Sequence, residues 1–589
     1  MALTAEQIEQ QRKQAEEVLF EGPQKLGFAK ALFFGQFQGP LLFPYPELKP
    51  SERDEVAKAV ADVRRFAEEE IDAVAIDRNA EIPADNVAGL GRLGVLGMTA
   101  PKEYGGRAFS QLGYTKVMEV IGGHCPSTAV FVNAHQSIGI RALLLFGTEE
   151  QRRRWLPKLV TGEQLAAFAL TEPEAGSDAS NVQTTAMPSV DGKSYVLNGE
   201  KRYITNGGIA KVLTVMARTP VPGSSETKVT AFLVTPDMPG FEVVEARMAK
   251  TGIRGTATAR LAFHNMPVPA ENVLGQVGKG LRVALTVLDF GRTTFGASCT
   301  GAAKVCLRAA VRHAKSRVQF KQPLAEFELV KKKIAYMAAH AFAMEATVSQ
   351  CAGFIDRGAD DYMLETAMLK VWSTEALWQI VNDTIQIFGG KAYFCDQPYE
   401  RMMRDARINQ IGEGANDVLR AFIAMVGMKS VADQLLGVRT ALSSPLKGFG
   451  TLMKFGRKQL QARFSTPEIP VQSADLQTDA HELAKRVAEF GRAVQSMLVR
   501  YREAILERQY VQERIADAGC ELYAASCTLS RVDQLLLHGN GNPHELKRDV
   551  TAGRYYLAYS NRRVRQCLAA LNDNDDALTT TAANAALER

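Results

Sequence analysis

Residues Phe168–Asp178 read FALTEPEAGSD, and Tyr203–Gly208 read YITNGG. Both stretches place hydroxyls, glycines and backbone amides at expected chain reversals, where a phosphate-bearing ligand can be held without cationic side chains. Gly176 permits close approach of the backbone, and Ser177 offers both a hydroxyl and an amide. Taken alone, the first stretch is compatible with an ordinary turn, because Gly, Ser and Asp favour turns. Together the two stretches predict a ligand site built from two loops.

The composition is that of a globular protein with several domains. The chain has 589 residues, of which 46% are hydrophobic, which suits about three or four domains. A net charge of +5 is small for this length and gives no support to nucleic-acid binding. The eight cysteines form no CxxC pair and indicate free thiols, and no HExxH motif indicates a metal site.

The sequence predicts a cytoplasmic location. No uninterrupted apolar run approaches the 18 or more residues of a membrane span. The first residues are rich in Gln and Glu, which argues against a secretory signal and against a mitochondrial presequence.

The pattern of periodicities changes along the chain from helical to extended and back to helical. Short β-branched runs at 194–198, 212–216 and 229–234 predict strands, with turns expected at Asn198–Gly199 and Pro222–Gly223. Helical periods dominate the blocks on both sides, which predicts an α+β fold with a small β domain between helical domains. The expected parts are an N-terminal extension (1–48), an N-terminal helical domain (49–165), a middle β domain (166–277), a C-terminal helical bundle (278–430), a basic amphipathic linker (431–470) and an extra helical domain (471–589).

The linker contains a basic segment at 439–464. Six basic residues and no acidic ones lie between Gln434 and Pro467, interleaved with Phe, Leu and Met close to helical spacing. Such a helix can lie in a membrane interface, with its cations on anionic headgroups. It is equally compatible with a linker helix that packs on the protein itself.

A second informative stretch, Gln386–Asp417, contains QIFGGKAY, PYERMMRDARI and IGEGAND. Glu413 lies between Gly412 and Gly414, so its carboxylate has little bulk around it and can face a ligand while neighbouring amides remain available as donors. The residues alone leave open the alternative that Glu413 only caps the following helix.

With these motifs the chain resembles the acyl-CoA dehydrogenase family over residues 50–430. AHQSIG (134–139), LLFGTEEQ (144–151) and SPLKGFGTLMKFGRKQL (444–460) extend the resemblance to its very-long-chain branch and that branch's complex-I-assembly relative. The resemblance implies the fold of that family, with a β-barrel-like middle domain. The same resemblance implies FAD as cofactor, acyl-CoA as substrate, a homodimer, and electron transfer to an electron-transferring flavoprotein. It also implies a peripheral membrane contact through 439–464 and a place at the inner face of the membrane.

By the same resemblance Glu413 is the general base that removes the α-proton of the acyl-CoA. A carboxylate buried beside an acyl chain is desolvated, which raises its basicity. In some members the base precedes an arginine on an earlier helix, but here that position is Gly291, before Arg292. Glu413 therefore has no competitor.

The resemblance assigns the remaining site residues by motif. Cofactor contacts are expected from Phe168, Leu170, Thr171, Gly176, Ser177, Tyr203, Thr205, Asn416 and Asp417. The dinucleotide end is expected to contact, across a dimer interface, Arg317, Gln319, Phe320, Gln386, Gly389 and Gly390. Substrate contacts are expected from Ser177 and Gly414, and from Asp289 and Arg292 near the CoA or acyl entrance.

The chain departs from the family pattern at Gly412, where an aromatic residue is usual, and at Ala415, Ala392 and Tyr203. Gly412 removes a ring from beside the reacting carbons, which widens the pocket or loosens Glu413. The sequence therefore leaves three alternatives to a long-chain dehydrogenase. These are a dehydrogenase of an unusual acyl-CoA, an oxidase, and a flavin-bearing assembly protein with weak activity.

Overall fold

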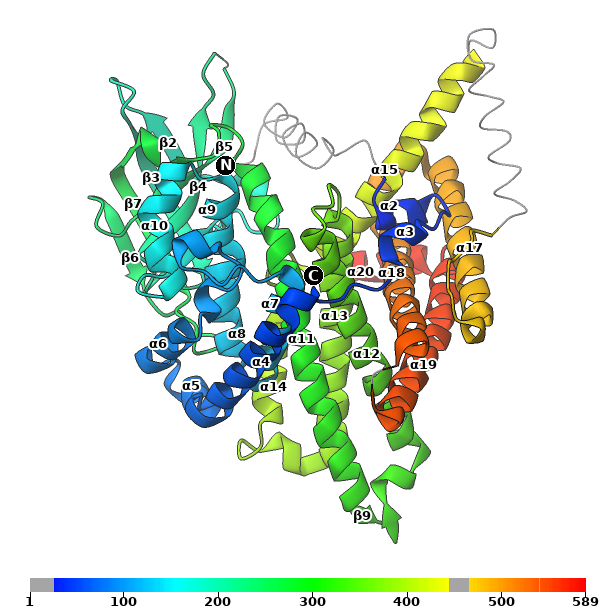
Figure 1. Cartoon of the computed structure of the whole chain (residues 1–589). Coiled ribbons are helices and arrows are strands. Elements are labelled where there is room, and N and C mark those ends of the chain that lie inside the picture. The colour runs from blue at the N-terminus through cyan, green and yellow to red at the C-terminus, as the bar shows by residue number, and fades with distance from the viewer. Residues whose placement is uncertain (1–25, 224, 444–465, 540, 589) are drawn as a thin grey trace.

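The structure is a computed structural model that describes residues 26–223, 225–443, 466–539 and 541–588, without the side chains of 434–443. In Figure 1 the sheet and the first helices lie on one side of the molecule, and the long helices α11, α12 and α13 run through its middle. The helices α17 (Gln477–Tyr501), α18 (Gln509–His538) and α19 (Pro543–Ala569) lie on the other side. The α+β fold expected from the sequence is confirmed.

Helices form the first block. α10 begins with a capping box in which Thr148 and Gln151 exchange side-chain and backbone hydrogen bonds, and Ser110 caps α7. The helices of this block are α4 (Pro50–Glu70), α5 (Ala73–Asn79), α6 (Ala84–Arg92), α7 (Gln111–His124), α8 (Pro126–Val132), α9 (Arg141–Phe146) and α10 (Glu149–Thr161).

Between α8 and α9 the helix widens into a π-helix, η3 (Asn133–Ile140). All eight of its residues are buried. The continuous stretch Pro126–Phe146 is long and apolar enough to cross a membrane, but 72% of its most apolar window is buried inside the protein. A core helix meets the same criterion.

An eight-stranded sheet forms the described part of the middle block, with the order β6-β7-β3-β2-β4-β5-β8 and β1 paired in parallel with β4. Its strands are β1 (Ala166–Ala169), β2 (Thr185–Pro188), β3 (Ser194–Ile204), β4 (Val212–Pro220), β5 (Thr227–Val234), β6 (Phe241–Glu245), β7 (Ala259–Pro269) and β8 (Val273–Leu274). The three expected strands are confirmed as parts of β3, β4 and β5. The turn expected at Asn198–Gly199 is wrong, because both residues lie inside β3 at a register irregularity where Gly199 has a φ of 149°.

The helical bundle consists of α11 (Gly280–Ser316), α12 (Glu328–Asp356), α13 (Met363–Phe388), α14 (Tyr399–Arg407) and α15 (Asn416–Ser443). Small residues let α11 approach α7 closely: a Cβ on Gly301 would lie 1.9 Å from the carbonyl oxygen of Glu119. A short hairpin, β9 (Val318–Gln319) and β10 (Gln322–Pro323), extends from the end of α11. The expected basic segment 439–464 lies outside the described residues, apart from the backbone of the last turns of α15.

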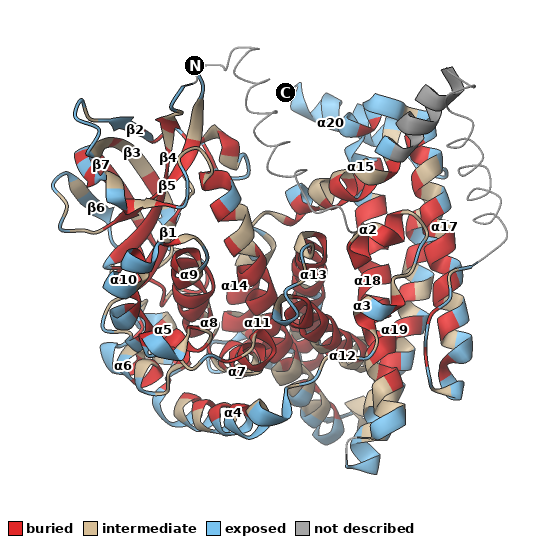
Figure 2. Cartoon of the chain, turned by 45° about the horizontal axis from the view of Figure 1, so that its top comes forward, coloured by how far each residue is buried: buried red, intermediate tan, exposed pale blue. Residues whose placement is uncertain are grey.

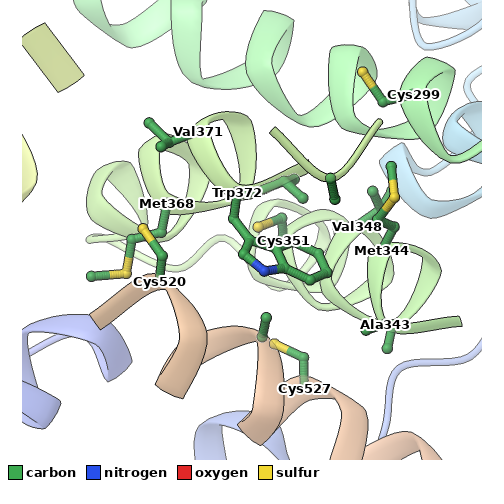
Figure 3. Packing of buried hydrophobic residues seen from close by; sticks show 14 of the residues in the cluster. Cys299, Ala343, Met344, Val348, Cys351, Met368, Val371, Trp372, Cys520 and Cys527 are labelled. Atoms are coloured by element: carbon green, nitrogen blue, oxygen red, sulfur yellow. The ribbon is translucent and has the colours of Figure 1, made fainter. Parts of the chain in front are cut away.

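The extra helical domain contains α17 (Gln477–Tyr501), α18 (Gln509–His538), α19 (Pro543–Ala569) and α20 (Asp576–Leu587). The apolar stripe of α17 is buried, including Val487, Phe490 and Val494. Figure 2 shows buried residues on the inward faces of α17, α18 and α19, with exposed residues outside. Its core is continuous with the bundle, as Figure 3 shows for Cys351 and Trp372 beside Cys520 and Cys527 of α18.

The N-terminal arm, residues 26–46, packs on the extra domain through α2 (Phe28–Phe33) and α3 (Gly39–Leu42). The rings of Phe33 and Phe490 are 5.0 Å apart, and the Leu42 carbonyl accepts from Ser530 Oγ at 2.6 Å. The arm thus brings residues near the beginning of the chain against helices of the extra domain.

Candidate active site

The two loops quoted first are joined by a buried ion pair. Lys201 Nζ donates to Glu172 Oε1 at 2.6 Å and to the Leu170 carbonyl at 3.0 Å, and both charged side chains are buried. The backbone amide of Arg202 donates to the Thr171 carbonyl at 2.9 Å. The end of β1 and the end of β3 are therefore held side by side.

The residues of the two loops differ in how far they are buried. Phe168, Leu170, Thr171 and Thr205 are half-buried, whereas Gly176 and Ser177 are exposed. An added Cβ on Gly176 would meet no atom within 4 Å. Phe168, Leu170, Thr171 and Thr205 thus lie deeper in the protein than Gly176 and Ser177.

Tyr203, also expected at the cofactor, lies at the end of β3. It has a φ of 63° and is 58% exposed, with the guanidinium of Arg202 5.0 Å from its ring centroid. The ring is therefore available to cover a bound ligand.

Glu413 lies on a strained turn between η8 (Ile408–Gln410) and α15. Its φ is 57° and that of Gly414 is 98°, in the left-handed region that residues other than Gly rarely adopt. Asn133 Nδ2 of η3 donates to Glu413 Oε1 at 2.7 Å. Oε2 is buried and has no hydrogen-bond partner among the described residues. The carboxylate is thus held by another element through one oxygen, and helix capping does not account for it.

Gly291 of α11 faces this free oxygen. A Cβ on Gly291 would lie 3.0 Å from Glu413 Oε2 and 3.2 Å from Ile138. Some family members are expected to carry the base at the position of Gly291. A carboxylate there would occupy the same space as the carboxylate of Glu413.

Arg292 and Asp289 lie on α11 beside Gly291. Both side chains are buried; Arg292 Nη1 donates to Asp289 Oδ1 at 3.3 Å, and Thr366 Oγ1 donates to the same oxygen at 2.8 Å. Burial raises the pKa of Asp289 to about 6, which Arg292 partly opposes. Their expected contact with the CoA or acyl entrance remains a prediction.

Lys370 of α13 is a buried cation beside the turn that carries Glu413. Its Nζ donates to the Gly414 carbonyl at 2.7 Å and to Asn416 Oδ1 at 2.8 Å. Asn416 Nδ2 in turn donates to Thr374 and Glu375. Asn416, expected at the cofactor, thus also holds the turn to α13. The neighbouring Asp417 has a side chain that is 99% exposed.

Burial raises the pKa of Glu413 to about 7, and three groups oppose this shift. These groups are Arg292 and Lys370, through their charge, and Asn133, through its hydrogen bond. Burial also lowers the pKa of Lys370 to about 8. A carboxyl group with a pKa near 7 is suited to act as a general base at neutral pH.

The π-helix η3 connects the base to the loops. His135 Nδ1 accepts from the amide of Ala166 in β1 at 2.9 Å, and its Nε2 lies 3.0 Å from the Leu159 carbonyl, so Nε2 carries the proton. Burial lowers the pKa of His135 to about 4, so the ring is neutral. Asn133, two residues earlier, contacts the base.

The residues expected at the dinucleotide end are exposed at the far end of the bundle. The β9–β10 hairpin has positive φ at Phe320 and Lys321, as a two-residue hairpin turn requires, and Phe320 is 89% exposed. Arg317 and Gln319 are exposed beside it, as are Gln386, Gly389 and Gly390 at the end of α13. Stacking of His313 on Phe388, with centroids 4.1 Å apart, places the two groups at the same end.

Sequence reasoning missed Asn133, Lys370, Glu172 and Lys201. Glu172 and Lys201 lie within the quoted motifs or next to them, but charged neighbours such as Glu174 and Arg202 give no sign of which charges are buried. Asn133 is 280 positions from Glu413 along the chain, and no local pattern relates the two. Among residues in the described ranges, no group of three His, Cys, Asp or Glu side chains could hold a metal ion.

Family models match most of the chain. The models "Acyl-CoA dehydrogenase, N-terminal domain", "middle domain" and "C-terminal domain" match residues 53–163, 167–266 and 278–428, and "ACAD9/ACADV, C-terminal domain" matches 474–586. The chain is 35% identical over 556 residues to the human very long-chain specific acyl-CoA dehydrogenase, mitochondrial, covering 93% of this chain and 84% of that protein.

A probable acyl-CoA dehydrogenase, FadE10, of Mycobacterium tuberculosis is 32% identical over 598 residues, covering 98% of this chain and 91% of that protein. A Bacillus anthracis acyl-CoA dehydrogenase solved in complex with FAD has a TM-score of 0.78 and 27% identity, covering 94% of each chain.

Proposed function

The chain belongs to the acyl-CoA dehydrogenase family, and on this basis we propose that it oxidises long- or very-long-chain acyl-CoA to trans-2-enoyl-CoA. This is the first step of fatty acid β-oxidation. In the proposed reaction Glu413 removes the α-proton of the thioester. The chain length is proposed from the similarity of the extra domain to that of the very-long-chain branch.

One observation carries the assignment of the base. Glu413 Oε2 is buried, directed at the face of α11 where Gly291 leaves room, and without a partner among the described residues. The other oxygen is fixed by Asn133, so the free oxygen has a defined direction. Such a carboxylate can take a proton from a carbon placed against Gly291.

The two loops fit FAD, the cofactor of this family. Thr171, Thr205 and Tyr203 would hold the ring system between β1 and β3, and the open backbone at Gly176 and Ser177 would hold phosphates. When bound there, FAD supplies the acceptor for the hydride that leaves the β-carbon. The Glu172–Lys201 pair keeps both loops in position before any ligand binds.

The location of the residues expected at the dinucleotide end of FAD supports a homodimer. Arg317 lies roughly 40 Å from Gly291 along α11, at about 1.5 Å per residue. An extended FAD is shorter than that, so one cofactor cannot reach both Glu413 and Arg317 of the same chain. We therefore infer that residues 317–320 and 386–390 hold the dinucleotide end of the partner's cofactor.

The remaining parts of the proposal rest on sequence and on family membership. An electron-transferring flavoprotein is the proposed acceptor. The proposed location is the cytoplasm, at the inner face of the membrane, where the cations of 439–464 would contact anionic lipid.

Anaerobic titration of the purified protein with palmitoyl-CoA tests the activity. We expect bleaching of the visible flavin band with the wild-type protein. Glu413→Gln keeps the shape of the side chain and its contact with Asn133, and should retain FAD while flavin reduction slows by about 10²–10⁴. Glu68→Gln, a surface carboxylate on α4, is the matched control and should behave as wild type.

The result also separates the alternatives left open by the sequence. A Cβ on Gly412 would have no atom closer than 3.6 Å, so there is free space where the family usually has a ring. Bleaching only by branched or bulky acyl-CoA would identify a dehydrogenase of an unusual substrate, and rapid reoxidation by air would identify an oxidase. A flavin that stays oxidised with every acyl-CoA would contradict the dehydrogenase and favour an assembly protein.

A further inference from the structure

A large cavity lies between the bundle and the extra domain, away from Glu413. Its volume is about 770 Å³, within the range of small-molecule sites. Residues of α12, α13 and α15 line one side, and residues of α18 and α19 line the other. The side chains expected at FAD or the acyl chain do not line it, so it is separate from the proposed active site.

One wall of the cavity is aromatic. His340 stacks on Tyr336 with ring centroids 3.7 Å apart and meets Tyr559 of α19 edge-on at 4.9 Å. Trp372 of α13 stacks beside His340 at 5.9 Å. Burial lowers the pKa of His340 to about 3, so this wall is neutral at physiological pH. It offers flat surfaces to a planar ring.

The rest of the lining is charged, with five cationic and four carboxylate side chains. Two of the cations are already paired: Lys333 with Asp383 at 2.5 Å, and Arg420 with Asp517 at 2.8 Å. The other three are Lys332, Arg562 and Arg563, and none of them forms an ion pair with another residue in the described part of the chain. The cavity thus has three cations without an ion-pair partner among the described residues at one place, and a neutral aromatic wall at another.

This combination excludes an acyl chain, which would leave the charged groups desolvated without partners. It suits a ligand with a flat base and phosphates. Carboxylates such as Glu521 can accept from the amino group of a base, while unpaired arginines bind phosphate through two parallel hydrogen bonds.

We propose that this interdomain cavity binds an adenine nucleotide, with its base at the aromatic wall beside Tyr559 and its phosphates at Lys332, Arg562 and Arg563. The ligand would be either a free nucleotide or the 3′-phospho-ADP part of CoA, which share this chemistry. Glu375 also lines the cavity and accepts from Asn416 Nδ2 at 2.8 Å. An occupant therefore contacts a residue that holds the turn of Glu413.

Calorimetric titration of the FAD-loaded full-length protein with ADP and, separately, with CoA tests the proposal without relying on turnover. We expect ADP to bind at one site per chain. The double variant Arg562→Gln/Arg563→Gln should weaken that binding at least roughly tenfold, because each charge-assisted contact contributes about 1.5–3 kcal/mol. Arg565→Gln changes an exposed arginine on the same helix that does not line the cavity, and should leave binding unchanged.

Comparison of ADP with CoA shows whether the cavity binds a free nucleotide or the nucleotide part of CoA. Two CoA sites per chain in the wild type and one in the double variant would identify CoA as the ligand, whereas an effect on ADP alone would identify a free nucleotide. Lys332→Gln, on a different helix, should weaken binding as well and covers the case in which the double variant does not fold. Absence of ADP and CoA binding at this site, binding unaffected by either variant, or release of flavin by ADP would overturn the proposal.

Discussion

Glu413 has an unfavourable backbone conformation, and its burial disfavours the charged form of its carboxylate. A left-handed φ of 57° costs on the order of 1–3 kcal/mol for a residue other than Gly. Lys370 offsets part of this, because its ammonium group binds the carbonyl of Gly414 and stabilises the charge of the carboxylate. Lys370 thus affects both the geometry and the basicity of Glu413, and Arg292 also stabilises the charged carboxylate.

This arrangement predicts the pH dependence of the reaction. Only the ionised carboxylate accepts a proton, and the pKa of Glu413 is raised to about 7. The rate constant of flavin reduction should therefore rise about tenfold per pH unit below pH 7 and level off above it. Stopped-flow absorbance between pH 5.5 and 8.5 measures it. A flat profile over this range would contradict the assignment of Glu413.

Replacement of Lys370 by Met removes the charge but keeps much of the side-chain length. Because the lysine lowers the pKa of Glu413, its loss should move the midpoint of the pH profile upward by roughly one unit. Arg292 remains as the second cation. Lys315→Met, on the exposed end of α11, should leave the midpoint in place. A reduced rate with an unmoved midpoint would indicate a structural effect only.

The glycines around Glu413 made this residue recognisable from sequence, whereas its partners could not be found there. Asn133 and Lys370 come close to the turn of Glu413 only because η3 and α13 both pack against α11, and α13 also packs against α15. A lone Asn and a lone Lys within apolar helical periods have no local signature. Their roles follow from tertiary structure.

At the scale of elements, the π-helix determines where side chains point. One additional residue per turn changes the angular positions of the side chains, so Asn133 faces Glu413 while His135 faces β1. No residue pattern in the sequence predicts that the helix widens into a π-helix here. The strands were predictable because β-branched runs are short and bounded by turns, but Gly199 was misread, since a bulge and a turn both favour Gly.

Helix α11 depends on close contact with α7. A methyl group on Gly301 would lie 1.9 Å from the Glu119 carbonyl oxygen, and backbone cannot move aside as a side chain does. Gly301→Ala should therefore lower the free energy of unfolding by about 1–3 kcal/mol, although Ala favours helices. Thermal or urea unfolding measures the change. Arg308→Ala, exposed on the same helix, is the control, and equal stability of both variants would contradict the close packing.

At the scale of the whole molecule, exposed apolar side chains gather at the end of the bundle. Phe320, Tyr393 and Phe394 are more than half exposed, although such residues are usually buried in a monomer. Phe320→Asp should separate the proposed dimer and lower the FAD content. Light scattering with the ratio of flavin to protein absorbance measures both effects. Val190→Asp, an exposed apolar residue elsewhere, is the control, and a Phe320→Asp variant that remains a fully flavinated dimer would contradict the proposed interface.

The N-terminal arm also has a consequence for the order of events during synthesis. The Leu42 carbonyl and the Ser530 hydroxyl that binds it are 488 positions apart. At about 5–20 residues per second, a ribosome needs roughly 25–100 s between them. Until α17 and α18 are made, Phe28 and Phe33 lack the rings of Tyr523 and Phe490 that cover them in the folded protein. A nascent chain thus exposes part of the aromatic surface of the arm until α18 has emerged, which makes the arm a natural target for chaperones.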